Sequence, residues 1–226
     1  MHRLAIIPAR GGSKRIPHKN SRPFLGKPMI SYVIQTAIES GLFDEVMVST
    51  DDAEIAAIAT RSGAVVPFLR SAANSDDHAT TLQVIEEVLH CYKQQDRVFE
   101  LVCCIYPTAP LMTVAHLTEG LQVLETKGFD SVFAAVSYGH PVWRGFELKD
   151  QKAEMIWPEN KSVRTQDLKT VYHDAGQWYW LRPDNLKDSI FTANTGMVVL
   201  PEMDVQDIDT PTDWKLAELK YKSRLE

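Results

Sequence analysis

The residues best suited to chemistry lie close to the N-terminus, in a short segment rich in cations. Arg10, Lys14, Arg15 and Lys19 place four positive charges around the pair Gly11-Gly12. Glycines let backbone amides approach a ligand closely, and fixed cations beside such amides suit a triphosphate. The simpler alternative is a basic surface loop, because charged residues are usually exposed. The segment therefore predicts either a polyphosphate site or a solvated loop.

Two acidic residues near the C-terminus have the spacing of a metal site. Asp207 and Asp209 flank Ile208 at the end of an apolar stretch that predicts a strand over 205–208. Residues i and i+2 of a strand share a face, so the carboxylates can converge while Ile208 points into the core. Two carboxylates suit Mg²⁺, with Mn²⁺ as a substitute. The alternative is that both acids cap the last helix.

Other motifs for nucleotides and metals are absent from the sequence or have simpler explanations. Neither GxGxxG nor GxxxxGK[ST] occurs, which argues against a dinucleotide site and a Walker loop. Asp51, with Glu54 three residues later, predicts a capping box and not a catalytic group. His78, His140 and His173 lack the spacing of metal ligands, so we expect no histidine metal site.

Strand-like and helix-like segments alternate along most of the chain, which predicts a mainly parallel sheet with helical crossovers. Apolar runs predict strands over 4–8, 45–50, 64–69, 99–106, 131–137 and 197–200. Helical spacing predicts helices over 28–40, 80–93 and 113–127, another between Asp51 and Gly63, and a last one with Thr210 as N-cap, Pro211 at N1 and Asp213 at N3. Ligands of such sheets bind at the carboxyl ends of the strands, where the cationic loop must lie.

The alternation breaks between 139 and 189. This range holds four of the five tryptophans, and short strands are predicted around 155–157 and 177–181. We interpret it as a subdomain inserted into a single domain that spans residues 1–226. Its aromatic residues predict a surface that covers the sheet edge or a partner chain.

Length and composition are those of one globular domain. The chain has 226 residues, 44% of them apolar, and a formal charge of −6. An acidic chain is an improbable general nucleic-acid binder, and no apolar run is long enough to span a membrane. The three cysteines form no CxxC or Cys/His ladder, so a reducing compartment and a cytoplasmic location are expected.

Six motifs in order along the chain resemble those of the acylneuraminate cytidylyltransferases, which activate sialic-type sugars as CMP conjugates. The motifs are 9–14 with Ile16-Pro17 and Lys19-Asn20, then 48–52, 68–70, 107–111, 164–168 and 207–210. The resemblance implies a Rossmann-like three-layer α/β/α nucleotidyltransferase fold, with an inserted subdomain that contributes to a homodimer and to the acceptor pocket. It also implies CTP and a nine-carbon sugar acid as substrates.

The resemblance also assigns roles to individual residues. The nucleotide-binding residues it implies are Ala9, Arg10, Gly11, Gly12, Ser13, Lys14, Lys19, Asn20, Arg70 and Thr81. The implied catalytic residues are Arg10, Lys19, Asp207 and Asp209, with Asp207 and Asp209 as the metal ligands. The implied sugar-binding residues are Tyr106, Arg164, Gln166, Asp174, Gln177 and Tyr179. Arginine is well suited to grip the sugar carboxylate in a bidentate pair.

Departures from the family pattern concern the acceptor sugar. Members that use N-acetylneuraminate commonly carry glutamine and arginine where this chain has Tyr106 and Met112, and glycine where it has His18. The segments 50–52, 172–180 and 213–218 are similar to the branch that activates pseudaminic acid. The expected reaction is CTP plus pseudaminic acid giving the CMP-sugar and diphosphate. N-acetylneuraminate and legionaminate are alternatives, KDO is less expected, and the alternatives of another class are a non-catalytic sugar-nucleotide binding module and an interaction protein.

Overall fold

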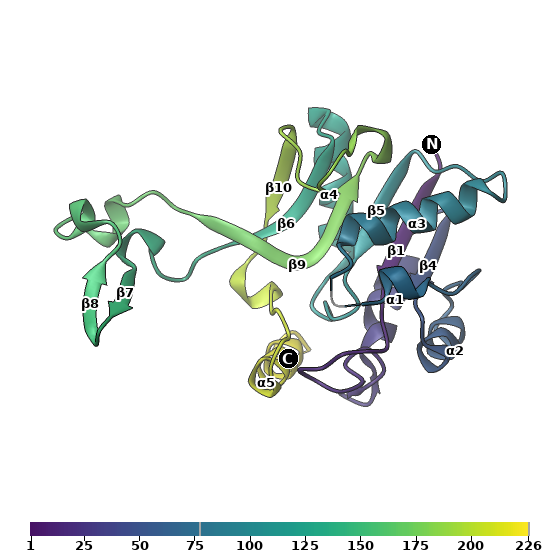
Figure 1. The fold of residues 1–226 in the computed structure, drawn as a ribbon, viewed down its shortest axis with the longest axis horizontal. Coiled ribbons are helices and arrows are strands. Elements are labelled where there is room, and N and C mark those ends of the chain that lie inside the picture. Colours follow the sequence, from purple (N-terminus) through teal and green to yellow (C-terminus); the bar gives the residue numbers. More distant parts are fainter. Residues whose placement is uncertain (77, 226) are drawn as a thin grey trace.

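A six-stranded sheet forms the centre of the molecule. The structure is a computed structural model that describes residues 1–76 and 78–225. The sheet order is β10-β6-β9-β5-β1-β4, and Figure 1 shows these strands side by side. Their bounds are β1 Arg3–Pro8, β4 Glu45–Ser49, β5 Leu101–Ile105, β6 Ser131–Ser137, β9 Tyr172–Leu181 and β10 Thr195–Val199. All neighbouring pairs are parallel except those that involve β9, which is antiparallel to β5 and to β6.

Helices cover both faces of the sheet, so the molecule has three layers. One face packs against α1 (Met29–Glu39), α2 (Ala53–Arg61) and α4 (Val114–Lys127), and the other packs against α3 (Thr81–Lys93). The predicted α/β class with a mainly parallel sheet is confirmed. Each face buries its own set of apolar side chains, and this burial is the main term that stabilises such a fold.

The helix starts follow from local side chains. Thr80 caps α3 and Thr113 caps α4, each in a reciprocal capping box, and Thr210 caps α5 (Pro211–Lys222) in the same way. These caps satisfy backbone amides that have no partner inside the helix. Gly128, with a φ of 66°, ends α4 in a left-handed conformation. The predicted N-cap and N1 residues of α5 are therefore confirmed.

The predicted strand over 64–69 is absent from the sheet. In the segment 64–69, only Val65 pairs with the sheet, through an isolated bridge to Met47. Pro67 has no amide hydrogen to donate to a ladder, so the segment leaves the sheet edge after a single bridge. It continues to Arg70, whose amide bonds to Thr50 O at 2.8 Å.

A third apolar cluster lies below the carboxyl edge of the sheet and joins the two ends of the chain. It contains Ile16 and Phe24 from the loop that follows β1, Met29 at the start of α1, and Ile208, Trp214 and Ala217 in and before α5. The loop also contains a short hairpin, in which the strands β2 (Pro23–Phe24) and β3 (Lys27–Pro28) have two residues each. Burial of Ile16 and Ile208 in the same cluster brings the cationic loop to the acidic segment.

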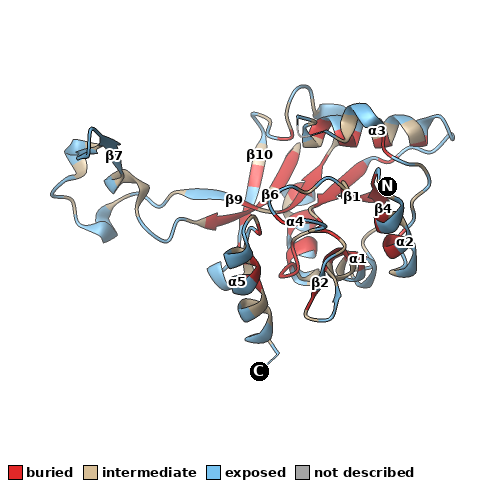
Figure 2. Cartoon of the chain, turned by 60° about the horizontal axis from the view of Figure 1, so that its bottom comes forward, coloured by how far each residue is buried: buried red, intermediate tan, exposed pale blue. Residues whose placement is uncertain are grey.

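A long arm projects from the body at the carboxyl edge of the sheet. The arm, residues 138–171, leaves the sheet after Ser137 and returns at Tyr172, and it carries the exposed hairpin of β7 (Phe146–Lys149) and β8 (Lys152–Met155). Figure 1 shows it extended away from the sheet, and Figure 2 shows that it is mostly exposed.

The arm is shorter than the predicted insertion, which reached residue 189. β9 belongs to the central sheet, and Trp178 and Trp180 are fully buried in this chain's own core. The expectation that these two tryptophans pack on a partner chain is therefore wrong. A strand covered on both faces is as rich in large apolar residues as an interface is, so the composition did not distinguish the two.

Gly120 gives a stability prediction for this core. A Cβ at Gly120 would lie 2.4 Å from Trp178 and 2.8 Å from Trp180. Alanine favours a helix by about 1 kcal/mol over glycine, but overpacking two rigid buried rings costs about 1–3 kcal/mol or more. We expect Gly120→Ala to lower the free energy of unfolding, measured by urea denaturation. A variant as stable as the wild type would contradict this packing.

No helix in the described parts of the chain is long and apolar enough to cross a membrane.

Candidate active site

A cleft of about 580 Å³ opens at the carboxyl edge of the sheet. Its walls are the loop after β1, the start of α3 and the loop after β5. Most of the predicted nucleotide residues line it: Arg10, Ser13, Lys14, Lys19, Asn20, Arg70 and Thr81. Of the others, Ala9 is buried beneath the loop, while Gly11 and Gly12 are not among the lining residues. The cleft lies where ligands of parallel α/β sheets bind.

The cationic loop is anchored at several points. Asn20 is buried, and its side-chain amide donates to Arg10 O at 3.0 Å. Ile16 is 1% exposed in the third apolar cluster. These contacts fix the loop from beneath, so its cations sit on an ordered frame. A merely solvated loop, the simpler alternative from the sequence, would have no need of such anchors.

Asp51 contacts this loop, which the sequence did not predict. Its Oδ1 accepts from the amide of Gly11 at 2.9 Å, while Asp52 is the residue that caps α2 by accepting from the amides of Glu54 and Ile55. The predicted cap at Asp51 is therefore wrong by one residue. A Cβ at Gly11 would lie 2.6 Å from the Asp52 carboxylate, so the close approach of the loop to α2 requires glycine.

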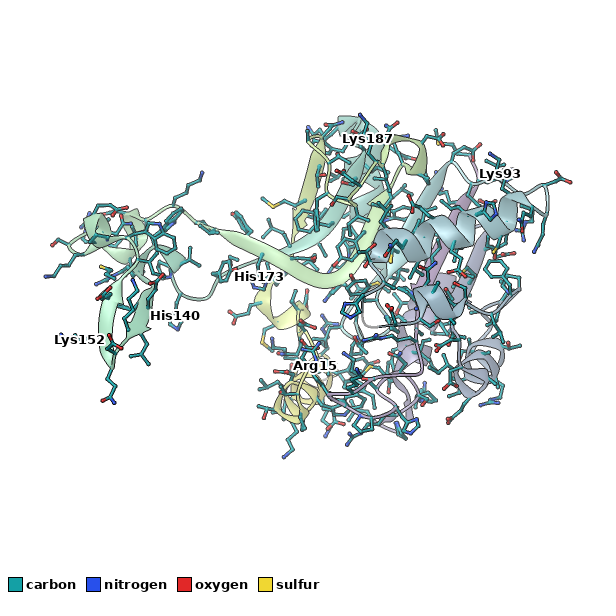
Figure 3. All side chains as sticks on the ribbon, viewed as in Figure 1. Arg15, Lys93, His140, Lys152, His173 and Lys187 are labelled. Atoms are coloured by element: carbon teal, nitrogen blue, oxygen red, sulfur yellow. The ribbon has the colours of Figure 1, made fainter. Side chains whose placement is uncertain are left out.

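The cationic loop meets the acidic segment directly. Lys19 Nζ donates to Ile208 O at 2.7 Å and lies 3.6 Å from Asp209 Oδ1, and Arg15 Nη1 bonds to Asp209 Oδ2 at 2.6 Å. Arg15 and Asp209 are 194 residues apart in the sequence. Figure 3 shows Arg15 beside α5 at the lower edge of the body. The structure thus brings together the two groups of residues that the sequence singled out.

The sequence predicted a strand over 205–208. The segment that carries the two acids makes no ladder bonds with the sheet, so it is not a strand. Ile208 nevertheless points inward and is fully buried, so the predicted alternation of side chains holds without a ladder. The cap of α5 is Thr210 with Asp213. Asp207 and Asp209 therefore do not serve as caps of that helix.

The two acids of the pair lie near enough to influence each other's charge. Burial raises the pKa of Asp207, and the nearby charge of Asp209 raises it further, while Lys19 and Arg15 partly oppose this. A divalent cation would relieve both effects. No group of three or more His, Cys, Asp or Glu side chains with metal-ligand geometry occurs among residues 1–76 and 78–225. Two carboxylates with phosphate and water suit Mg²⁺, so the residues present fit that ion.

Arg70 is held rigidly at the opposite side of the cleft. Its Nε donates to Ser49 Oγ at 2.9 Å, and its side chain also bonds to Ser49 O. Burial lowers its pKa, while the charges of Asp51 and Glu87 oppose the shift. Arginine remains charged under such shifts, so Arg70 presents a fixed positive charge to the cleft.

A chain of hydroxyl groups runs from the cleft toward the arm. Tyr106 OH bonds to Thr81 Oγ1 at 2.8 Å, and the ring of Tyr106 lies 5.2 Å from that of Tyr179. Tyr179 OH donates to Asp174 Oδ2 at 2.7 Å. Burial raises the pKa of Tyr179, as do the neighbouring Tyr106 and Asp174, so its hydroxyl keeps its proton. Three predicted sugar residues are thus linked to the predicted nucleotide residue Thr81.

The other predicted sugar residues do not meet in the cleft. Gln177 is buried and donates to Asp204 O at 2.6 Å. Arg164 and Gln166 lie in the exposed arm, where Arg164 pairs with Asp167 at 2.8 Å. Within one chain the arm extends away from the cleft (Figure 1). A smaller hollow of about 280 Å³, lined in part by Asp174 and Asp207, lies between the acid pair and the base of the arm.

Comparison with a solved structure first concerns the fold, which is Rossmann-like as predicted. It resembles the structure of a CMP:2-keto-3-deoxy-manno-octonic acid synthetase complexed with CTP, with a TM-score of 0.70 and 18% identity over 99% of this chain and 100% of the other. At that identity the likeness concerns the fold alone.

The sequence then defines the family. Residues 4–191 match the profile described as Cytidylyltransferase, and the chain belongs to this family. It is 41% identical to a pseudaminic acid cytidylyltransferase of Campylobacter jejuni, over 98% of this chain and 97% of the relative. It is 31% identical to a CMP-N,N'-diacetyllegionaminic acid synthase of Legionella pneumophila, over 96% and 95% respectively. The chain is therefore an enzyme of the nucleotidyltransferase class, and the predicted family is confirmed.

Proposed function

We propose that the protein transfers CMP from CTP to pseudaminic acid and releases diphosphate. The observation that carries the proposal is the contact of the cationic loop with Asp209 at the edge of the main cleft. The 41% identity to a pseudaminic acid cytidylyltransferase over nearly the whole chain supports the choice of substrates. N-acetylneuraminate and legionaminate remain alternative acceptors, and a non-catalytic binding module is the alternative of another class.

In the proposed mechanism, the anomeric hydroxyl of the sugar attacks the α-phosphorus of CTP. A new P–O bond forms to the sugar, the bond to diphosphate breaks, and the proton of the hydroxyl is released to solvent water. Arg10, Lys14 and Lys19 bind the triphosphate and offset the charge that develops on it. Asp207 and Asp209 would hold Mg²⁺, or Mn²⁺ in its place, which stabilises charge on the phosphate oxygens when bound. Positioning and electrostatics carry such transfers, and no covalent enzyme intermediate is required.

The acceptor lies, in this proposal, between the aromatic pair and the acid pair. Tyr106, Tyr179 and Asp174 form one wall through their hydrogen-bonded hydroxyl and carboxylate groups. Gln177 supports that wall from below through its bond to Asp204. Arg164 and Gln166 project from the arm and reach an acceptor only if another copy of the chain supplies them.

We further propose a homodimer in which each arm packs on the other copy. The arm exposes Phe146, Leu148 and Ile156, with exposed fractions of 63%, 79% and 43%. At the open edge of the sheet, Met197 and Val199 of β10 are also exposed. Apolar residues on an unpaired edge strand are a liability unless a partner covers them.

A panel of substrates tests the reaction. Purified protein is given Mg²⁺ with each of the four nucleoside triphosphates, and with pseudaminic, legionaminic and N-acetylneuraminic acids and KDO, while diphosphate release is followed. We expect release with CTP and pseudaminic acid, and none after chelation of the metal. A different preferred acid would change the assigned acceptor. Binding of CTP without release under any condition would support the binding module.

The proposed site of action is the cytoplasm. The three cysteines in the described chain, Cys91, Cys103 and Cys104, are all unpaired thiols. Burial raises the pKa of Cys104 to about 12, so this thiol stays protonated and unreactive. Such cysteines fit a reducing compartment.

A further inference from the structure

A cluster of charged side chains lies next to the segment that carries the acid pair. Asp204 ends the short 3-10 helix Glu202–Asp204 and lies three residues before Asp207. Its Oδ1 bonds to Arg224 Nη2 at 2.5 Å, and its Oδ2 lies 3.3 Å from His116 Nε2. The side chains of His116, Asp204 and Arg224 are 11%, 24% and 25% exposed, so water screens these contacts only partly.

The neighbouring groups determine which nitrogen of His116 carries the proton. Nδ1 of His116 accepts from the amide of Thr113 at 3.3 Å. The proton of a neutral imidazole must then sit on Nε2, where it points at the Asp204 carboxylate. Arg224 also donates to Leu111 O at 2.7 Å. Arg224 therefore ties the acidic segment to the loop after β5, and Pro107 and Thr108 of that loop line the cleft.

The backbone around Asp204 depends on side chains as well. Gln177 of β9 donates to Asp204 O at 2.6 Å. Lys220 of α5 donates to Val205 O at 2.6 Å and to Glu202 O at 3.0 Å. Because the segment has no ladder bonds, these bonds and the burial of Ile208 set where Asp207 and Asp209 lie. A shift of Asp204 would therefore pass directly into the acid pair.

We propose that His116, Asp204 and Arg224 form a positioning clamp that sets the geometry of the Asp207/Asp209 pair for its divalent cation. The proposal rests on the proposed function. Asp204 itself touches no substrate; it acts through the three-residue connection to Asp207 and, by way of Arg224, on the loop after β5. Partners that orient metal ligands typically contribute about 10- to 100-fold in metal affinity or activity.

Metal binding without turnover tests the clamp. The fraction of free Mn²⁺ is measured by electron paramagnetic resonance for protein saturated with CTP and given no acceptor. We expect Asp204→Asn to bind Mn²⁺ at least about 10-fold more weakly than the wild type. Metal-free binding of CTP, measured in EDTA, should change much less than Mn²⁺ binding, since the cationic loop that binds the triphosphate lies apart from Asp204 in the contacts of the cluster. A merely structural role would lower the melting temperature and weaken both kinds of binding together.

A matched control and a second variant keep the test decisive. Glu125→Gln removes an ion pair of comparable exposure, to Arg3 at 3.1 Å, away from the cleft lining, and should leave Mn²⁺ binding unchanged. If Asp204→Asn does not fold, Arg224→Gln takes its place, since it removes the charge that pairs with Asp204. A variant that combines both substitutions should lose no more Mn²⁺ affinity than the single variant with the larger loss, since the residues act as a unit.

Two outcomes would overturn the inference or its basis, and they can be told apart. Variants that bind Mn²⁺ as tightly as the wild type would refute the clamp and leave the proposed reaction intact. Wild-type protein that binds no Mn²⁺ in the presence of CTP would instead refute the metal assignment in the proposed function.

Discussion

Asp209→Asn lowers kcat by roughly 100-fold or more, on the proposed mechanism, because the metal charge it helps to hold contributes several kcal/mol at the transition state. The KM for CTP should not rise. Asp209 pairs with Arg15 and Lys19, so its neutralisation frees both cations for the triphosphate. Steady-state kinetics at saturating acceptor separates the two parameters.

The fold of this variant should be intact. The ion pair between Arg15 and Asp209 is largely exposed, at 71% and 32%, and such pairs contribute about 0–1 kcal/mol. We therefore expect a melting temperature within a few degrees of the wild type, as for the control Glu125→Gln. Near-normal turnover in Asp209→Asn would refute the metal assignment.

The parts of the site that the sequence predicted well are those set by local spacing. Ile208, between Asp207 and Asp209, is drawn into an apolar cluster as its place in the pattern predicted, whether or not a ladder forms. The predicted helix cap at Thr210 is equally local, since a hydroxyl reaches an amide three residues away. Such contacts depend on a few neighbouring residues and can be inferred from them.

The parts that the sequence did not predict depend on distant contacts. Asp51 and Asp52 are adjacent and chemically identical, and only the position of the cationic loop decides which of them caps α2. The Asp204 contacts join three parts of the chain, and no spacing pattern marks them. The strand β9 is buried between two strands that precede it in the sequence, so only the sheet order reveals that its tryptophans are core residues.

The arm poses the remaining question, since it carries two predicted sugar residues away from the cleft of its own chain. Arg164 is exposed and pairs with Asp167 on the same short turn. If a partner's arm completes each site, Arg164→Gln should lower kcat/KM for the sugar acid by at least about 10-fold, because a charge-assisted contact to a carboxylate is lost. The KM for CTP should stay close to that of the wild type.

Mixing two inactive variants distinguishes a shared site from one completed within a single chain. After subunit exchange, an Asp209→Asn chain offers an intact arm to the body of an Arg164→Gln chain, whose acid pair is intact. Half of the dimers are then mixed, and each has one complete site. Equal amounts should therefore recover about a quarter of the wild-type activity in a dimer of identical interfaces. Recovery requires both a dimer and an arm that crosses to the partner. If size-exclusion chromatography shows dimers and exchange is complete, failure to recover activity would place Arg164 outside the acceptor site.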